Sequence, residues 1–289
     1  MTVVDIVAPV RNEEEALPRF IADVDALRLP DGVSLNLLFV EDSSTDGTVE
    51  LLRRLSADRN DVGYVRLERS YGQGPAVFIG TRISTGDAVV MMDADGSHPV
   101  ARIPDMIAAF LQGNDIVQGV RQGTPNPAAH RRWASRLFPF AARAVTGVDL
   151  AEQNCYFRLM SQAAARHVLA HPRYWRSVRF PLPPSRKFRV AKIDVTSRER
   201  VAGQSKYPLL RLLSFATDVM LSLISWPRVI ALTAVGIGGA VMVWPYAPVV
   251  SALAGVAIAV AVTKFLRIAL HRVEDDMIIV ERDGIANDG

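Results

Sequence analysis

The chain has 289 residues, enough for one large domain or two small ones, and carries a net charge of +3 with a single cysteine, Cys155. That cysteine count excludes an intrachain disulfide and a cysteine-based zinc site. The charges are unevenly distributed along the chain, because residues 1–120 carry a net charge of −9 and residues 121–211 a net charge of +14. An acidic part followed by a basic part favours a metal or nucleotide site beside a surface for phosphates or anionic lipid headgroups. Nucleic acid is disfavoured as a partner, since no zinc, helix-turn-helix or RNP signature is present.

Strands and helices alternate through the first 120 residues. The pattern predicts strands at 3–7, 35–40, 63–67, 88–92 and 115–119, and helices at 16–27, 49–55, 76–84 and 103–111. Ser, Thr and Asp residues between 43 and 48 are expected to cap the second helix. Alternation with short joins predicts a parallel, right-handed, doubly wound sheet. No Walker loop or Gly-x-Gly-x-x-Gly follows the first strand, which disfavours P-loop enzymes and the usual dinucleotide dehydrogenases. No signal sequence opens the chain, so we expect this domain to stay in the cytoplasm.

The strand at 88–92 ends in two carboxylates one residue apart, Asp93 and Asp95, followed by Gly96, Ser97 and His98. Ligands of open α/β sheets bind beyond the carboxyl ends of the strands. Mg²⁺ or Mn²⁺ is usually held there by one or two carboxylates together with substrate phosphates. An ordinary turn has the same composition. The alternating α/β pattern around the pair favours the metal site, with His98 as a supporting residue.

A basic region follows the first 120 residues. An amphipathic helix is expected from about 130 to 145, in which Arg131 and Ser135 lie four residues apart and share one face. A guanidinium beside a hydroxyl suits a phosphate, although a solvated helix face would look the same. A helix at 162–169 and a strand at 188–195 complete this region.

The last third of the chain is apolar. Residues 207–226 form an amphipathic pattern typical of helices in a membrane interface. Residues 229–263 carry no charge and are interrupted at 244–248, which predicts two spans of roughly 16–18 residues. Basic residues flank the pair and its tip is uncharged, so both ends are expected in the cytoplasm. A buried soluble hairpin is the alternative. Small residues at 236–239 permit close helix packing, within the chain or in a homo-oligomer, and residues 274–280 are expected to form a small helix or an edge strand.

Six motifs in order carry a family resemblance. The three N-terminal ones are Pro9-Val10-Arg11-Asn12-Glu13-Glu14, Glu41-Asp42-Ser43-Ser44-Thr45-Asp46-Gly47-Thr48 and Asp93-Ala94-Asp95-Gly96-Ser97-His98-Pro99. These resemble glycosyltransferases of family 2 with the GT-A fold. The others are Gly119-Val120-Arg121, Phe157-Arg158-Leu159-Met160-Ser161 and Arg200-Val201-Ala202-Gly203-Gln204-Ser205-Lys206-Tyr207. They are similar to polyprenyl-phosphate glycosyltransferases, the group of dolichyl-phosphate mannose synthase and the bacterial undecaprenyl-phosphate enzymes. The resemblance covers about residues 3–226.

The resemblance implies an α/β fold with four parts. A cytoplasmic GT-A domain, Rossmann-like with a mostly parallel sheet, would occupy residues 1–205. An amphipathic juxtamembrane helix would follow at 206–227, a transmembrane helical hairpin at 228–270 and a cytoplasmic tail at 271–289. The protein would then be a two-span protein of the plasma (inner) membrane, with both termini in the cytoplasm.

It also implies roles for named residues. The nucleotide sugar would be bound by Pro9, Arg11, Glu13, Asp42 and Asp93. The divalent cation, Mg²⁺ or Mn²⁺, would be held by Asp93 and Asp95. The lipid phosphate would be bound by Arg121, Arg131, Ser135, Ser205 and Lys206. The catalytic set would be Asp93, Asp95, Arg121 and Arg200.

Three positions depart from the usual family pattern. Gln73 stands where a lysine often follows glycine, Ser97 where a metal-contacting glutamine is common, and Tyr156 where many bacterial members have aspartate. The last departure puts in doubt a catalytic carboxylate before Phe157.

The implied reaction transfers a glycosyl group from a nucleotide-diphosphate sugar, of the GDP-mannose or UDP-hexose type, to a membrane polyprenyl phosphate with inversion. Undecaprenyl, decaprenyl and dolichyl phosphates all remain candidate acceptors. One alternative is a processive polysaccharide synthase, which needs a channel that one hairpin cannot build and typically has glutamine where Ala129 stands. The other is a non-catalytic, membrane-bound nucleotide-sugar sensor or assembly partner.

Overall fold

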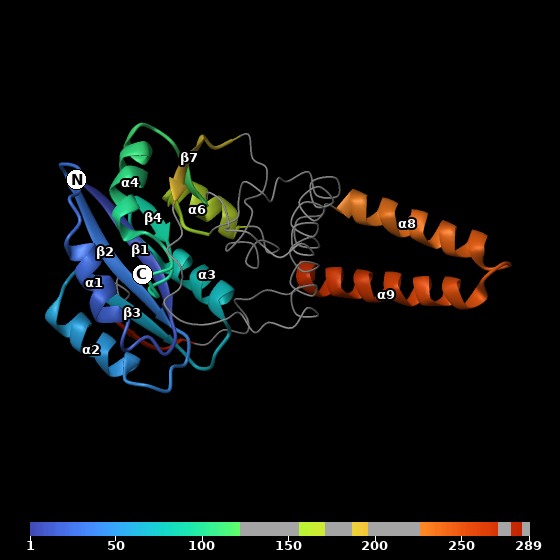
Figure 1. The fold of residues 1–289 in the computed structure, drawn as a ribbon, viewed down its shortest axis with the longest axis horizontal. Helices are drawn as coiled ribbons and strands as arrows, with labels where there is room; N and C mark the ends of the chain where they lie inside the picture. The colour runs from blue at the N-terminus through green and yellow to red at the C-terminus, as the bar shows by residue number, and fades with distance from the viewer. Residues whose placement is uncertain (122–155, 171–186, 196–225, 271–278, 285–289) are drawn as a thin grey trace, which may run out of the picture.

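The computed structural model describes residues 1–121, 156–170, 187–195, 226–270 and 279–284. These residues form an α/β domain built on one sheet, and a pair of long helices (Figure 1). The strands of the sheet are β1 (Thr2–Val10), β2 (Val33–Glu41), β3 (Val62–Leu67), β4 (Ala88–Met91), β5 (Ile116–Arg121), β6 (Arg158–Ser161), β7 (Val190–Val195) and β8 (Ile279–Asp283). Their order across the sheet is β7-β5-β6-β4-β1-β2-β3-β8.

The sheet is mostly parallel, as the alternating pattern predicts. β1 pairs in parallel with β2 and β4, β2 with β3, and β5 with β7. The exceptions are β6, antiparallel between β4 and β5, and β8, antiparallel to β3 at the edge. The parallel strands therefore bring their carboxyl ends, and the polar residues that follow them, to one edge of the sheet.

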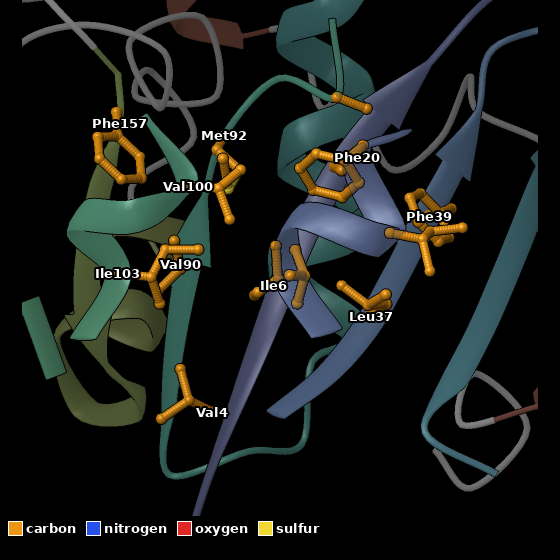
Figure 2. Packing of buried hydrophobic residues seen from close by; sticks show 14 of the residues in the cluster. Val4, Ile6, Phe20, Leu37, Phe39, Val90, Met92, Val100, Ile103 and Phe157 are labelled. Carbon is orange, nitrogen blue, oxygen red and sulfur yellow. The ribbon is translucent and has the colours of Figure 1, made fainter. Parts of the chain in front are cut away.

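Helices cover both faces of the sheet because the strands are apolar on both faces. The helices of the domain are α1 (Leu17–Asp25), α2 (Thr48–Asp58), α3 (Gln73–Ile83), α4 (Ile103–Leu111), preceded by η1 (Val100–Arg102), and α6 (Gln162–Leu169). α1, α2 and α4 pack on one face, where Figure 2 shows Phe20 and Ile103 against Ile6 and Val90. α3 and α6 pack on the other face, where Val7 and Val89 point.

Helix boundaries match the sequence expectations closely at 103–111 and 162–169. The sequence predicts a Ser, Thr or Asp at the N-cap of the second helix, and this position is wrong, because Gly47 occupies the N-cap of α2 and has no side chain to cap with. Asp46 instead accepts a hydrogen bond of 3.1 Å from the Thr48 N–H inside the first turn.

Two apolar helices lie side by side and extend away from the sheet, α8 (Trp226–Val243) and α9 (Pro248–Leu270) (Figure 1). They pack closely at Gly236, where an added Cβ would lie 2.9 Å from the side chain of Ile258. Among the described helices, α9 is long and apolar enough to cross a membrane over Pro248–Leu266, whereas the apolar stretch of α8, Val229–Val243, is shorter. The expected amphipathic segment before residue 226 lies outside the described residues.

Candidate functional site

A pocket of about 250 Å³ lies at the carboxyl edge of the parallel strands. It is lined by Pro9, Val10, Arg11, Glu13, Asp42, Gly72, Gln73, Asp93, Ala94 and Asp95. These residues end β1, β2 and β4 or begin α3. The structure thus brings together the residues expected to bind the nucleotide sugar and both residues expected to hold a cation.

The loops after β1 and β2 are tied to each other, which positions Arg11 and Glu13. Asn12 adopts a left-handed backbone with φ of 56°, a conformation that Asn tolerates better than most residues. Its Oδ1 accepts a 2.8 Å hydrogen bond from the N–H of Thr45, and its own N–H donates to Ser44 Oγ at 3.0 Å. The N–H of Glu13 donates to Thr48 Oγ1 at 3.0 Å. The two loops therefore form one rigid wall of the pocket.

Asp42 holds the loop that begins α3. Its Oδ1 accepts from the N–H of Tyr71 at 2.7 Å, and its Oδ2 accepts from the N–H of Gly72 at 2.9 Å and from Ser70 Oγ at 2.8 Å. The residue is 4 % exposed and still lines the pocket. The sequence predicts that Asp42 binds the nucleotide sugar, and these contacts add a second role, because they fix the position of Gln73 beside the pocket.

The two acids after β4 have different surroundings. Asp95 exposes its side chain, and its Oδ1 accepts from the N–H of Ser97 at 2.9 Å, across a turn in which Gly96 takes a φ of 76°. Asp93 is more enclosed, and its Oδ1 accepts hydrogen bonds from Gln73 Nε2 and from the Tyr156 hydroxyl. Ser97 Oγ lies 3.4 Å from Asp93 Oδ2.

His98 supports this turn. It is 4 % exposed, and its Nδ1 accepts from the N–H of Asp93 at 3.0 Å, so that nitrogen carries no proton in this arrangement. The imidazole stacks on Phe157 with ring centroids 5.3 Å apart. The supporting role expected from the sequence agrees with this geometry.

Carboxylates dominate the electrostatics of the pocket. Glu13, Asp42, Asp93 and Asp95 line it together with one guanidinium, that of Arg11. The pKa of Glu13 is raised, first by burial and then by the negative charges of Asp95 and Asp46. A cluster of hard carboxylate oxygens suits a divalent cation chemically.

The residues present fit a cation that also takes ligands from a bound phosphate. In the part of the chain that the structure describes, no group of three or more His, Cys, Asp or Glu side chains is arranged to hold a metal alone. Asp95 Oδ2 has no hydrogen-bond partner among the described residues, which leaves it available. A Mg²⁺ or Mn²⁺ ion that relies on one or two carboxylates plus substrate phosphates needs no more than this.

The residues expected at the lipid phosphate are less fully placed. Arg121 is the last residue of β5, in parallel pairing with Val195 of β7. The others lie outside the described residues: Arg131, Ser135, Arg200, Ser205 and Lys206.

The three departures from the family pattern, Gln73, Ser97 and Tyr156, have no role predicted from the sequence, and all three contact Asp93. No local pattern could have shown this, because Gln73 and Tyr156 lie 83 residues apart in the chain.

Comparison with known proteins agrees with this architecture. Residues 5–169 match the family model described as glycosyl transferase family 2. The undecaprenyl-phosphate 4-deoxy-4-formamido-L-arabinose transferase of Pseudomonas aeruginosa (strain LESB58) is 34% identical over 227 residues, which are 78% of this chain and 66% of the relative. The enzyme of the same name from Pseudomonas fluorescens (strain SBW25) is 32% identical over 254 residues, 87% of this chain and 74% of the relative. The chain thus spans about two thirds to three quarters of the length of these relatives.

A solved structure shares the fold. Glucosyl-3-phosphoglycerate synthase from Mycobacterium tuberculosis, in complex with Mn²⁺, uridine-diphosphate and phosphoglyceric acid, superposes with a TM-score of 0.51 at 17% identity, over 77% of each chain. The family model covers more than half of the chain, and the relatives exceed 30% identity. The chain belongs to glycosyltransferase family 2.

Proposed function

We propose that this protein transfers a glycosyl group from a nucleotide-diphosphate sugar to a membrane polyprenyl phosphate. The observation that carries the proposal is the acidic pocket at the carboxyl edge of the sheet, in a chain that also has a pair of apolar helices. The names of the matched relatives, which place undecaprenyl phosphate on the acceptor side, support it. The similar solved structure is a complex with UDP and Mn²⁺, so UDP sugars are tested as donors beside GDP sugars.

The chemistry is a displacement at the anomeric carbon. An oxygen of the acceptor phosphate forms a bond to this carbon while the bond to the nucleoside diphosphate breaks and its electron pair leaves with the diphosphate, inverting the configuration. A phosphate monoester has its second pKa near 6 and is largely ionised at neutral pH. No general base is therefore required, and Tyr156 in place of an acid is compatible with activity.

The protein must bring two polyanions together and stabilise the charge of the leaving group. Asp93 and Asp95 would hold the divalent cation, which supplies Lewis-acid stabilisation of the leaving diphosphate. Arg11 lines the same pocket and would offset the charge of the nucleotide. Arg121 and Arg200 complete the proposed catalytic set, and with Arg131, Ser135, Ser205 and Lys206 they would hold the lipid phosphate by orientation and electrostatics.

The return of the chain to the sheet supports a two-span topology. β8 follows both apolar helices and pairs with β3, which precedes them, so the segments before and after the pair belong to the same domain. Two segments of one folded domain lie on the same side of a membrane. If α9 crosses the bilayer, α8 must cross it too, and its short apolar stretch is accommodated by local thinning. We therefore propose a domain of residues 1–205 and a tail of 271–289 on the cytoplasmic face of the inner membrane, joined by a juxtamembrane helix at 206–227 and a hairpin at 228–270.

A turnover assay tests the function. The full chain in lipid nanodiscs is incubated with Mn²⁺ or Mg²⁺, a panel of UDP and GDP sugars, and undecaprenyl, decaprenyl or dolichyl phosphate, and the lipid fraction is analysed by mass spectrometry. A cation-dependent lipid-linked sugar is expected. Nucleotide-sugar binding without any lipid product would favour the sensor instead, and a polymeric product would favour a polysaccharide synthase.

A further inference from the structure

The side chains of Gln73, Tyr156 and Asp93 form a closed ring of hydrogen bonds at the wall of the pocket. Gln73 Nε2 donates to the Tyr156 hydroxyl oxygen at 2.7 Å and also to Asp93 Oδ1. The Tyr156 hydroxyl donates to the same carboxylate oxygen. The three residues come from the start of α3, the loop after β4 and the segment before β6, so the ring joins three parts of the chain.

The ring rests on a rigid base. Tyr156 is 5 % exposed, and its ring packs edge-on against His98 with centroids 4.9 Å apart. His98 in turn accepts a hydrogen bond from the Asp93 N–H. Because the phenol and the carboxylate are both held, the amide of Gln73 is held by them.

The ring also fixes which way the Gln73 amide faces. A carboxylate only accepts hydrogen bonds, so the NH₂ group must face Asp93 and both of its N–H bonds are used within the ring. The amide oxygen, Oε1, has no hydrogen-bond partner among the described residues, and Gln73 lines the pocket. The pocket wall thus presents an oriented neutral acceptor beside a cluster of carboxylates.

We propose that Gln73 is a specificity residue whose Oε1 accepts a hydrogen bond from a hydroxyl or amide N–H of the donor sugar, with Tyr156 as its positioning residue. The proposal rests on the proposed function, because it takes the bound molecule to be a nucleotide sugar. A diphosphate offers acceptor oxygens and cannot pair with an amide oxygen, whereas a sugar is rich in hydrogen-bond donors. Sites that pair with a substrate OH or NH reject analogues that lack it.

The test separates binding of the sugar from binding of the nucleotide. Dissociation constants are measured by calorimetry on the full chain in detergent with Mn²⁺, for UDP and GDP and for UDP-glucose, GDP-mannose and UDP-linked 4-deoxy-4-formamido-L-arabinose. Gln73→Met, which keeps the length and removes the amide, should weaken the preferred nucleotide sugar about tenfold and change the nucleoside diphosphate by less than about twofold. Tyr156→Phe, which keeps the ring, should give a smaller loss of the same kind. Tyr246→Phe, in the exposed turn between α8 and α9, is the matched control and should change neither constant.

The binding constants test the role of Gln73 and the proposed function separately. An equal loss for the nucleoside diphosphate and the nucleotide sugar, or no loss for either, would overturn the role of Gln73. Retained binding of the nucleoside diphosphate shows in the same experiment that the variant is folded. A wild-type chain that binds none of these nucleotides would instead contradict the proposed function, and with it this inference.

Discussion

The guanidinium of Arg53 on α2 and the carboxylate of Glu281 on β8 form two parallel hydrogen bonds of 2.7 Å, although the residues lie 228 positions apart. The hydroxyl of Tyr64 on β3 donates to the same carboxylate. Arg66 lies 3.9 Å from it and 3.2 Å from the fully buried Glu41 at the end of β2. Side-chain contacts therefore hold β8, the last described strand, to the domain in addition to its backbone pairing with β3.

The contribution of these contacts to the stability of the protein should depend on pH. The Arg53 guanidinium, with further help from Tyr64 and Arg66, lowers the pKa of Glu281 from 4.5 to about 2. A carboxyl whose pKa falls on folding contributes stability that is complete above its unfolded value and is lost as the pH falls through its folded value. The loss should therefore occur between about pH 4.5 and pH 2. Glu281→Gln should lower the melting temperature of the full chain at pH 7, and the gap to the wild type should close towards pH 2.

Melting curves at several pH values check this, with Glu50→Gln as the control, because Glu50 contacts Arg53 at 3.4 Å on the exposed face of α2. That surface pair should contribute little. A gap between wild type and Glu281→Gln that is independent of pH would contradict the role given to the carboxylate charge.

The position of β8 also predicts from which side of the membrane different parts of the chain can be labelled. In a Cys155→Ser background, single cysteines at Asn60 and at Gly289 should react with a membrane-impermeant maleimide only after intact cells are opened. A cysteine at Tyr246, in the turn between α8 and α9, should react from outside. Labelling of positions 60 and 289 from opposite sides would contradict the proposed two-span topology.

Much of the sheet domain could be predicted from the sequence because its signals are local. Apolar runs ending in acids, and helices with an apolar stripe, located the strands before Asp42 and Asp93 and the helices at 103–111 and 162–169. The position of β6 between β4 and β5 could not be predicted, because strand order depends on contacts between distant segments. The sequence of the tail is compatible with a helix or an edge strand. The segment forms a strand because it pairs with β3, which lies far away in the sequence.

The site was predictable where its residues end strands and not where distant side chains meet. Asp42, Asp93 and Asp95 follow parallel strands, so the sequence brings them to one edge. Asp42 holds the backbone of Tyr71 and Gly72, and Tyr156 contacts Asp93. These contacts depend on how distant segments pack, so the sequence alone does not predict them.

The close approach of α3 to the sheet gives a stability prediction. A Cβ at Gly80 would lie 2.4 Å from Val7 Cγ1 and 2.8 Å from Val40 Cγ2, both on rigid strands. Gly80→Ala should therefore lower the stability by about 1–3 kcal/mol, as overpacking does. Gly74→Ala, also in α3 and with nothing within 4 Å of its Cβ, should change it by less than about 0.5 kcal/mol. Denaturation of both variants in the same detergent checks this, and equal effects would show that the contact at Gly80 is unimportant.

The carboxylate of Asp42 gives a binding prediction. Asp42→Asn keeps one acceptor oxygen, but the amide NH₂ cannot accept, so either the Tyr71 or the Gly72 N–H loses its partner. An unsatisfied buried donor costs about 1–3 kcal/mol, which is about 5–150-fold in affinity if the loop must reform to bind. We expect weaker binding of nucleoside diphosphate by calorimetry. Asp58→Asn, at the exposed end of α2, should bind nucleoside diphosphate normally. Normal binding by Asp42→Asn as well would show that the loop at Tyr71 and Gly72 does not contribute to nucleotide binding.

The strongest test of the cation site is Asp95→Ala. Its carboxylate is exposed in the pocket, engages one backbone N–H, and its charge helps to raise the pKa of Glu13. Removal of one electrostatic contact that stabilises a transition state costs about 10²–10³ in rate. We expect cation-dependent transfer to fall by at least that factor, while the protein is recovered in the membrane fraction at wild-type levels. Asp105→Ala is the matched control, since Asp105 pairs with Arg102 on the surface at 2.5 Å, away from the pocket lining. Normal turnover by Asp95→Ala, or an equal loss of activity in both variants, would contradict the assignment of Asp95 as a ligand of the cation.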